Sequence, residues 1–247
     1  MKVIVIIPAA GLGTRMASAA SAGKSAGAAV GKAAPSKQFA ELGGVPIVIH
    51  TLRKFAASPS VAAIYVAVRA AEIDNLQTRL AQEKFKVPIH LVEGGEHRQE
   101  SVAKALAVVT ADADDVVLVH DAVRPFLDQE IITHVIEAAL KHGAAIVGIP
   151  AVDTIKLVDR SAEDALITST VPRERAVLAQ TPQGFRFKLL KQAMDEALAD
   201  GFSGTDEASL LERSGHKVAV VMGSPRNFKI TAPADLQLAE FYLKSSS

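Results

Sequence analysis

The chain opens with a continuous run of β-branched residues at positions 3–7, which predicts a central parallel strand covered on both faces. Apolar runs and amphipathic segments then alternate along the chain. Because strands that alternate with helices form parallel sheets, this order predicts an α/β fold, with a mostly parallel sheet and helices on both faces. Further strands are predicted at 61–68, 87–92, 116–119 and 144–149, and helices at 72–83, 99–109 and 129–141.

The alternation breaks between about residues 151 and 181. Short apolar runs at 155–158, 167–171 and 176–179 are separated by charged turn residues, without a helical segment between them. This pattern predicts a β-hairpin arm that projects from the main sheet. Helices are predicted again at 187–198, 206–214 and 235–243, with a strand at 217–221. We therefore predict a single domain over residues 1–247 that carries the arm.

A Gly-rich turn directly follows the first strand. It leaves backbone N–H groups open to an anion at the carboxyl edge of the predicted sheet, where nucleotides usually bind. An arginine in the same segment supplies a matching positive charge. These features predict phosphate chemistry, and the residues concerned are Pro8, Ala9, Ala10, Gly11, Gly13 and Arg15.

Two common phosphate-binding motifs are excluded. The dinucleotide motif G-x-G-x-x-G fails because Met16 takes the place of its last glycine. A P-loop would need a glycine at Ser18, five positions before Gly23, and a strand ahead of it, and the chain has neither.

Composition narrows the classes of partner. The 27 basic and 27 acidic residues give a net charge of zero, which argues against a nucleic-acid partner. No apolar run is long enough for a membrane span, and the short run at the start does not read as a secretory signal. The chain has no cysteine, which fits a cytoplasmic protein.

A low-complexity segment at about 17–34 consists almost entirely of Ala, Ser, Gly and Lys. Its glycines favour a loop over the helix that alanine prefers. One interpretation is a tolerated surface insertion. The other is a flexible lid whose Lys24 or Lys32 helps to close over phosphates.

Eight separated motifs together resemble one family. They cover essentially the whole chain and occur in this order: PAAGLGTRM (8–16), PSKQF (35–39), GGEHRQES (94–101), HDAVRP (120–125), DTIK (153–156), QTPQGF (180–185), TDEAS (205–209) and NFKIT (227–231). This set closely resembles the 2-C-methyl-D-erythritol 4-phosphate cytidylyltransferases of the non-mevalonate isoprenoid pathway. The resemblance implies a Rossmann-like sheet of the nucleotide-diphospho-sugar transferase type.

The resemblance also implies the reaction and the roles of the site residues. The 4-phosphate of methylerythritol attacks the α-phosphorus of CTP, giving the CDP-alcohol and pyrophosphate. Mg²⁺, or another divalent cation, is held mainly by the CTP phosphates, with no direct protein ligand. The implied catalytic residues are Arg15, Lys37 and Lys229. The implied CTP-binding residues are Pro8, Ala9, Ala10, Gly11, Gly13, Gly94, Gly95, Glu96, Ser101 and Asp121. The implied substrate-binding residues are Asp121, Arg124, Thr154, Arg173, Thr181 and Lys229.

Several residues keep a second interpretation. Ser101 can serve only its own helix backbone, and Asp121 and Asp206 can cap helices. We expect His120 to be a packed histidine rather than a general base, whereas Arg98 can be a solvated helix residue. Arg175 is expected on the same strand face as Arg173 and can be confused with it.

The chain also departs from the family pattern, because Ser36 separates Pro35 from Lys37 and the insertion lengthens the loop after Arg15.

The resemblance further implies a homodimer in which the arm reaches the partner's site. A cytidylyltransferase for another polyol phosphate, such as ribitol 5-phosphate, is the closest alternative. A non-catalytic nucleotide-binding module is the alternative of another class. It would be expected to have lost one of the cations Arg15, Lys37 or Lys229, and all three are present.

Overall fold

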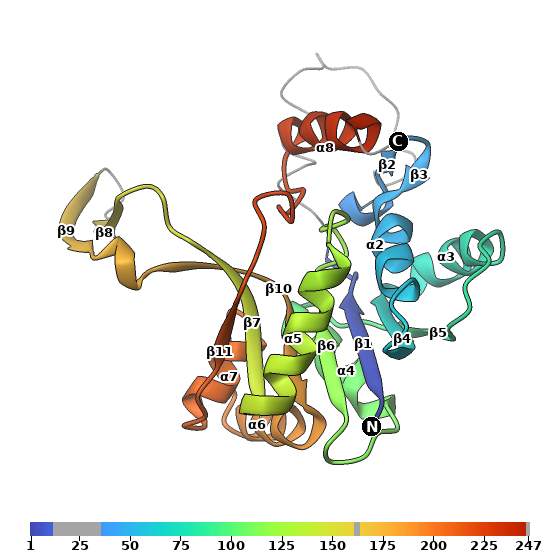
Figure 1. Cartoon of the computed structure of the whole chain (residues 1–247), viewed down its shortest axis with the longest axis horizontal. Coiled ribbons are helices and arrows are strands. Elements are labelled where there is room, and N and C mark those ends of the chain that lie inside the picture. Colours follow the sequence, from blue (N-terminus) through green and yellow to red (C-terminus); the bar gives the residue numbers. More distant parts are fainter. Residues whose placement is uncertain (12–35, 161–163, 246–247) are drawn as a thin grey trace.

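The computed structural model describes residues 1–11, 36–160 and 164–245. Its centre is a seven-stranded sheet with the strand order β11-β7-β10-β6-β1-β4-β5 (Figure 1). Only β10 runs antiparallel to its neighbours, so the predicted mostly parallel sheet is confirmed. The strands are β1 (Val3–Pro8), β4 (Val61–Val68), β5 (Ile89–Glu93), β6 (Val116–Val119), β7 (Ala144–Pro150), β10 (Val177–Arg186) and β11 (Ala219–Met222).

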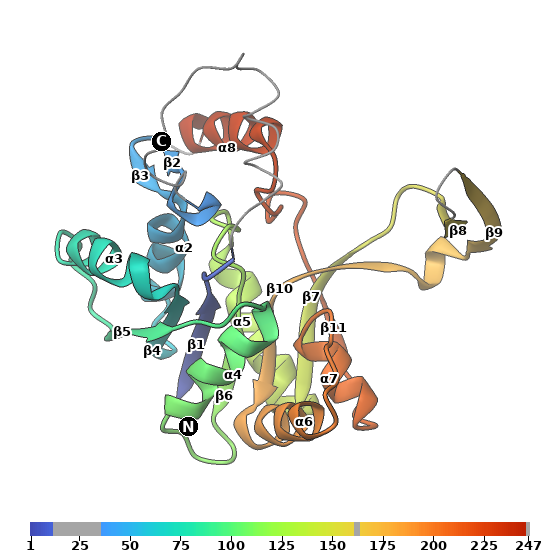
Figure 2. The ribbon, with the colours of Figure 1, turned by 180° about the vertical axis from the view of Figure 1, so that it is seen from behind.

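Helices cover both faces of this sheet (Figures 1 and 2). Alternate residues of β1 show the two layers, because Val5 joins the core beneath one face and Ile6 the core beneath the other. On the first face lie α2 (Ile47–Ala56), α3 (Ile73–Leu80) and α5 (Gln129–His142). On the second lie α4 (Arg98–Val108), α6 (Phe187–Ala199) and α7 (Glu207–Arg213).

Shorter elements complete the body. The small hairpin of β2 (Glu41–Leu42) and β3 (Val45–Pro46) lies near α8 (Pro233–Ser245), and a third apolar cluster packs beneath α8. Two 3₁₀ helices, η1 (Lys37–Phe39) and η2 (Ala70–Glu72), precede α2 and α3. Of the helices, α2 was not predicted. None of the helices in the described part of the chain has the length and apolar character of a transmembrane span.

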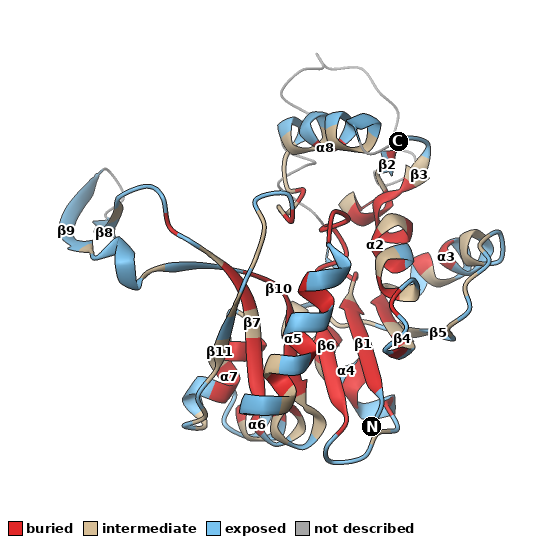
Figure 3. Cartoon of the chain, viewed as in Figure 1, coloured by how far each residue is buried: buried red, intermediate tan, exposed pale blue. Residues whose placement is uncertain are grey.

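The arm is a hairpin of β8 (Ile155–Arg160) and β9 (Ala165–Val171) that projects from the body, and most of its residues are exposed (Figure 3). Two expectations about it were wrong. The run at 176–179 is not a separate arm strand, because it belongs largely to β10, which pairs with β7 from Val177 onwards. Arg173 and Arg175 lie in the 3₁₀ helix η3 (Arg173–Arg175) rather than on a strand face.

Candidate active site

The turn after β1 lies at the carboxyl edge of the sheet, as predicted. Ala9 and Ala10 are buried, and the Ala9 N–H donates to the carbonyl of Ala67 at 2.7 Å. The amide of Gln38 donates to the carbonyls of Ala9 and Gly11, which ties the turn to η1. Of the residues predicted in this segment, Gly13, Arg15 and the insertion at 17–34 lie outside the described residues.

A cavity of about 150 Å³ opens beside this turn. It brings Lys37, Asp121 and Lys229 together, although they come from three distant parts of the chain. Arg98 and Ser101 line it from α4. The remaining lining residues are Pro8, Ala9, Ala10, Gly11, Gln38, Ala122 and Val123.

Asp121 is the centre of a charged cluster at this edge. It follows β6 closely in sequence, and its carboxylate contacts Lys229 Nζ at 2.9 Å and the Nε atoms of Arg98 and Arg124 at 3.3 Å each. Burial alone would raise the pKa of this carboxyl, but the three cations hold the pKa well below its ordinary value. Asp121 is therefore an anion at physiological pH and fixes the direction of the cations around it.

Arg98 belongs to this cluster, so the interpretation as a solvated residue was wrong. Its Nη1 donates to both carboxylate oxygens of Glu207 at 2.7 and 2.8 Å, while its Nε faces Asp121. The Glu207 side chain is 1% exposed, and burial raises its pKa against the opposing effect of Arg98. Burial lowers the pKa of Arg98, but Glu207 and Asp121 outweigh it and raise the pKa above its ordinary value. The ion pairs of Arg98 thus connect α4 with α7 and with the segment that follows β6.

A second cavity, of about 290 Å³, adjoins the first and shares Arg98, Asp121 and Lys229 with it. Arg124 lies on this side, and its Nη1 donates to the Asn227 carbonyl at 2.6 Å. The other lining residues are Ala179, Gln180, Thr181, Gln183, Thr205 and Asp206.

The loops around the second cavity are held by two side chains whose role the sequence did not indicate. The buried Asn227 donates to the carbonyl of Thr181 at 2.8 Å. Gln183 donates to Asp206 at 2.7 Å. Asp206 also accepts from the Ser209 N–H at 3.0 Å, which is the helix-cap interpretation of this residue.

His120 is a packed residue, as expected. It is fully buried, its ring lies edge-on to Phe55, and its Nε2 is 3.1 Å from the Arg124 carbonyl. A carbonyl only accepts, so Nε2 carries the proton and Nδ1 accepts from the Thr181 hydroxyl at 3.1 Å. That hydroxyl in turn accepts from the Asp121 N–H at 3.0 Å. Burial lowers the pKa of His120 to about 4, so the neutral ring is a fixed support beneath Asp121.

This histidine makes stability depend on pH. The unfolded chain takes up the His120 proton near pH 6.5 and the folded protein only near pH 4, so protons favour unfolding between these values. The free energy of unfolding is expected to lose about 3 kcal/mol from this residue as pH falls through that window. Urea unfolding at pH 7 and pH 4.5 measures it. His120→Asn should show a smaller difference between the two pH values, and an unchanged difference would contradict the assignment.

The predicted CTP-binding residues Gly94, Gly95, Glu96 and Ser101 lie between the end of β5 and the first turn of α4, next to the turn after β1. Gly94 packs so closely against Ala10 that a Cβ on Gly94 would lie 2.4 Å from the Ala10 Cβ. Ser101 accepts from the Gly95 N–H at 3.0 Å and donates to the His97 carbonyl at 3.0 Å, so its hydroxyl shapes this turn. A broad cavity of about 890 Å³ runs along the segment and includes Ala10, Arg69 and Glu96.

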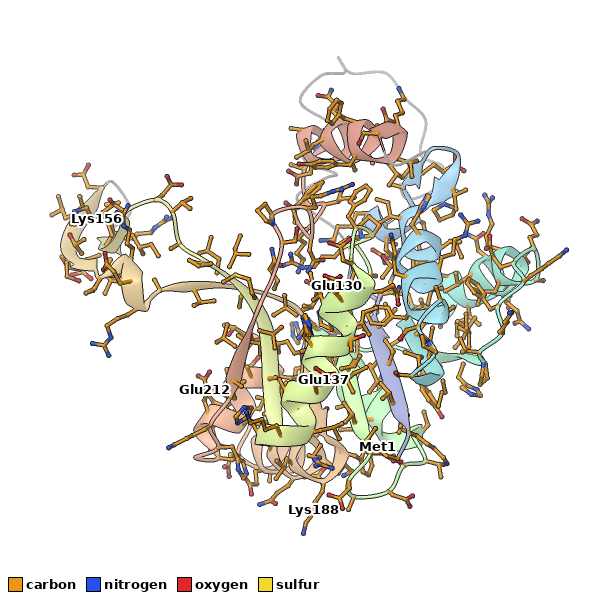
Figure 4. All side chains as sticks on the ribbon, in the orientation of Figure 1. Met1, Glu130, Glu137, Lys156, Lys188 and Glu212 are labelled. Atoms are coloured by element: carbon orange, nitrogen blue, oxygen red, sulfur yellow. The ribbon has the colours of Figure 1, made fainter. Side chains whose placement is uncertain are left out.

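The structure does not bring the two arm residues to the cavities of their own chain. Thr154 and Arg173 are both exposed, and Arg173 donates to the Val152 carbonyl at 3.3 Å. Figure 4 shows the arm, marked by Lys156, well away from the body. Of the predicted substrate-binding residues in the described chain, only Asp121, Arg124, Thr181 and Lys229 line the cavities.

Acidic groups are sparse where a metal ion would bind. Within residues 1–11, 36–160 and 164–245, no three His, Asp or Glu side chains gather as metal ligands. Among the described residues that line the first cavity, Asp121 is the one carboxylate, and it forms ion pairs with three cations. This donor set fits an ion carried by ligand phosphates better than an ion held by the protein.

Cations outnumber carboxylates around the two cavities, and the backbone of the Gly-rich turn forms one wall of the first. The polyphosphate of a nucleotide suits both features, because its negative charge pairs with the cations and its oxygens accept hydrogen bonds from backbone N–H groups. The fold and the site together are therefore those of a nucleotide-binding protein of the α/β class.

Comparison with known proteins identifies the family. The family model IspD: 2-C-methyl-D-erythritol 4-phosphate cytidylyltransferase matches residues 3–245. A protein of that name from Acidobacterium capsulatum is 57% identical over 249 residues, which cover 100% of this chain and 99% of that protein.

Solved structures agree. A 4-diphosphocytidyl-2C-methyl-D-erythritol synthase from Anaerococcus prevotii superposes with a TM-score of 0.80 at 28% identity, covering 98% of both chains. A 2-C-methyl-D-erythritol 4-phosphate cytidylyltransferase from Thermus thermophilus has a TM-score of 0.74 at 33% identity, covering 99% of this chain and 100% of that one. The chain belongs to the 2-C-methyl-D-erythritol 4-phosphate cytidylyltransferase family, whose members are CTP-dependent enzymes of isoprenoid precursor synthesis. The predicted family, fold class and enzyme class are confirmed.

Proposed function

We propose that residues 1–247 form one catalytic unit in which the two adjoining cavities hold the two substrates of the cytidylyl transfer. A 4-phosphate oxygen of methylerythritol phosphate forms a bond to the α-phosphorus of CTP. The bond from that phosphorus to the bridging oxygen of the β-phosphate breaks, and pyrophosphate leaves. The observation that carries the proposal is the convergence of Lys37, Lys229 and Arg98 on one cavity around Asp121.

The chemistry needs charge neutralisation rather than a base. A phosphate monoester has its second pKa near 6, so it is already a nucleophilic anion near pH 7. The neutral, buried His120 is consistent with this, because no proton has to be removed. The barrier lies in bringing two anions together and in stabilising charge on the equatorial oxygens. Lys37, Lys229 and Arg15 are the catalytic cations in this proposal.

The first cavity takes the triphosphate, with the turn at Pro8, Ala9, Ala10 and Gly11 beside it, and Gly13 is a further CTP-binding residue in this proposal. The second takes the methylerythritol phosphate, with Arg124 and Thr181 on its far side. Lys229 lines both cavities, and its ion pair with Asp121 holds it between the two substrates. A divalent cation such as Mg²⁺ would be held by the CTP phosphates rather than by protein ligands, and it would supply charge neutralisation for the leaving pyrophosphate.

Gly94, Gly95, Glu96 and Ser101 bind the cytosine through backbone groups and a fixed hydroxyl. Gly94→Ala is therefore expected to raise the KM for CTP by about tenfold. An added methyl group in a tightly packed region forces its neighbours to shift, which costs on the order of 1–3 kcal/mol of free energy. The added methyl group would displace either Ala10 or this turn. Initial rates at varied CTP measure the effect, with a melting curve to establish that the variant is folded. A folded Gly94→Ala protein with the KM of the unaltered protein would contradict the assignment.

We further propose a cytoplasmic homodimer in which Thr154 and Arg173 serve the partner's site. The arm exposes Leu157, Leu166 and Ile167, and an isolated hairpin with exposed apolar residues needs a surface to pack on. Arg173 suits a phosphate, because a guanidinium binds it with two parallel hydrogen bonds.

A pyrophosphate-release assay tests the function. The purified protein is incubated with CTP and Mg²⁺, and with either 2-C-methyl-D-erythritol 4-phosphate or ribitol 5-phosphate. Release is expected with the first acceptor and not without an acceptor. A much higher kcat/KM with ribitol 5-phosphate would make the chain a cytidylyltransferase for another polyol phosphate.

A further inference from the structure

A buried polar network lies behind η1, outside both cavities. The hydroxyl of Ser36 donates to Glu72, which also accepts from Arg69. Ser36 is 2% exposed, and the Glu72 side chain is 11% exposed. Ser36 immediately precedes Lys37, whereas Glu72 stands 36 residues further along the chain, where α3 begins.

Neither side chain performs the local role that its position would suggest. Ser36 is the N-cap residue of η1, where a serine usually accepts from a backbone N–H, but its side chain makes no capping hydrogen bond. Glu72 is the N-cap residue of α3 and makes no side-chain cap either. Both groups instead form a contact between segments that are distant in sequence.

This contact is one of two anchors on either side of Lys37. On the other side, the buried Gln38 donates to the Ala9 and Gly11 carbonyls of the turn. The backbone between the anchors is a tight 3₁₀ turn, closed by the Phe39 N–H to the Ser36 carbonyl at 2.8 Å. Lys37 is thus attached to a backbone that is fixed before and after it, while its side chain lines the first cavity.

Two polar atoms of the network also lack a hydrogen-bond partner among the described residues. These atoms, Glu72 Oε2 and Arg69 Nε, are both buried. An unsatisfied buried polar atom destabilises a fold, so the contacts among the described residues do not by themselves explain why this network is polar. Arg69 also lines the broad cavity beside Gly94 and Gly95, which places the network between that cavity and Lys37.

We propose that Glu72 is a positioning residue for Lys37, which it orients by holding Ser36. The proposal rests on the catalytic role proposed for Lys37. Because a side chain displaced by about 1 Å can lose most of its catalytic effect, removal of the anchor should act on kcat more than on KM for CTP.

A double-mutant cycle between Ser36 and Lys37 tests the proposal. Ser36→Ala is expected to lower kcat by about tenfold in the unaltered protein, since loss of a hydrogen bond to a charged group has an effect of that order. In a Lys37→Ala background, Ser36→Ala should lower kcat no further. Glu72→Ala, which removes the acceptor of the Ser36 hydroxyl, should behave like Ser36→Ala, and Ser36→Thr, which keeps the hydroxyl, should retain most of the activity. Ser58→Ala is the matched control, a buried serine that lines neither cavity.

The outcomes separate the two proposals. If Lys37→Ala itself keeps full kcat, the catalytic role of Lys37 is wrong. If Lys37→Ala lowers kcat but Ser36→Ala does not, the positioning role of Glu72 is wrong. The positioning role is also overturned if Ser36→Ala lowers kcat equally in both backgrounds, because the serine would then act on the fold in general. Melting curves of all variants accompany the kinetics.

Discussion

Lys229→Ala is expected to lower kcat by about 100-fold or more, with a smaller change in the KM for CTP. The lysine lines both cavities and is fixed by Asp121 at 2.9 Å. Its charge should matter most when negative charge develops between the two substrates, so its loss should appear in kcat. The fold should persist, because Asp121 keeps Arg98 and Arg124 as partners.

Lys188→Ala is the matched control for this prediction. Lys188 lies on α6 and lines neither cavity, and it stands at the opposite end of the molecule from α8 (Figures 1 and 4). Its loss should leave both kinetic constants unchanged. If Lys229→Ala retained the kcat of Lys188→Ala, Lys229 would have no role in the transfer step.

Recovery of activity in mixed dimers is the second large effect that we expect. Arg173→Ala and Lys37→Ala should each be nearly inactive, because one removes a phosphate contact and the other a catalytic cation. If the arm serves the partner, the mixed dimer has one site with both defects and one site with neither. Mixing the two proteins under conditions of subunit exchange should therefore restore activity.

A tagged subunit verifies that mixed dimers form. Self-mixing of either variant under the same conditions is the control and should restore nothing. Mixed dimers without activity would mean that each arm serves its own chain, and a protein that stays monomeric would contradict arm exchange altogether.

The main sheet could be predicted because its signal is local. The β-branched run at the start of the chain, interrupted by Pro8, contains enough information to identify β1 and the turn after it. The place of Asp121 follows from the same kind of local signal, since a residue that follows a buried parallel strand lies at the carboxyl edge of the sheet. Roles such as that of Ser101 came from the resemblance rather than from the pattern.

Contacts between residues that are far apart in the sequence could not be predicted from it. Arg98 looks like an ordinary charged residue at the start of a helix, and its partner Glu207 lies 109 residues away. The run at 176–179 has the pattern of any short strand. Its membership of β10 depends on the insertion of that strand between β6 and β7, which only the folded chain determines.

The fate of an isotope label tests the central claim most directly. The protein is incubated with unlabelled CTP and with methylerythritol 4-phosphate whose phosphate oxygens carry a heavy oxygen isotope. The masses of the products are then measured by mass spectrometry. Attack by the 4-phosphate on the α-phosphorus predicts that all of the label stays in the CDP-alcohol and that the pyrophosphate is unlabelled. Labelled pyrophosphate, or release of CMP in place of the CDP-alcohol, would contradict the proposed transfer.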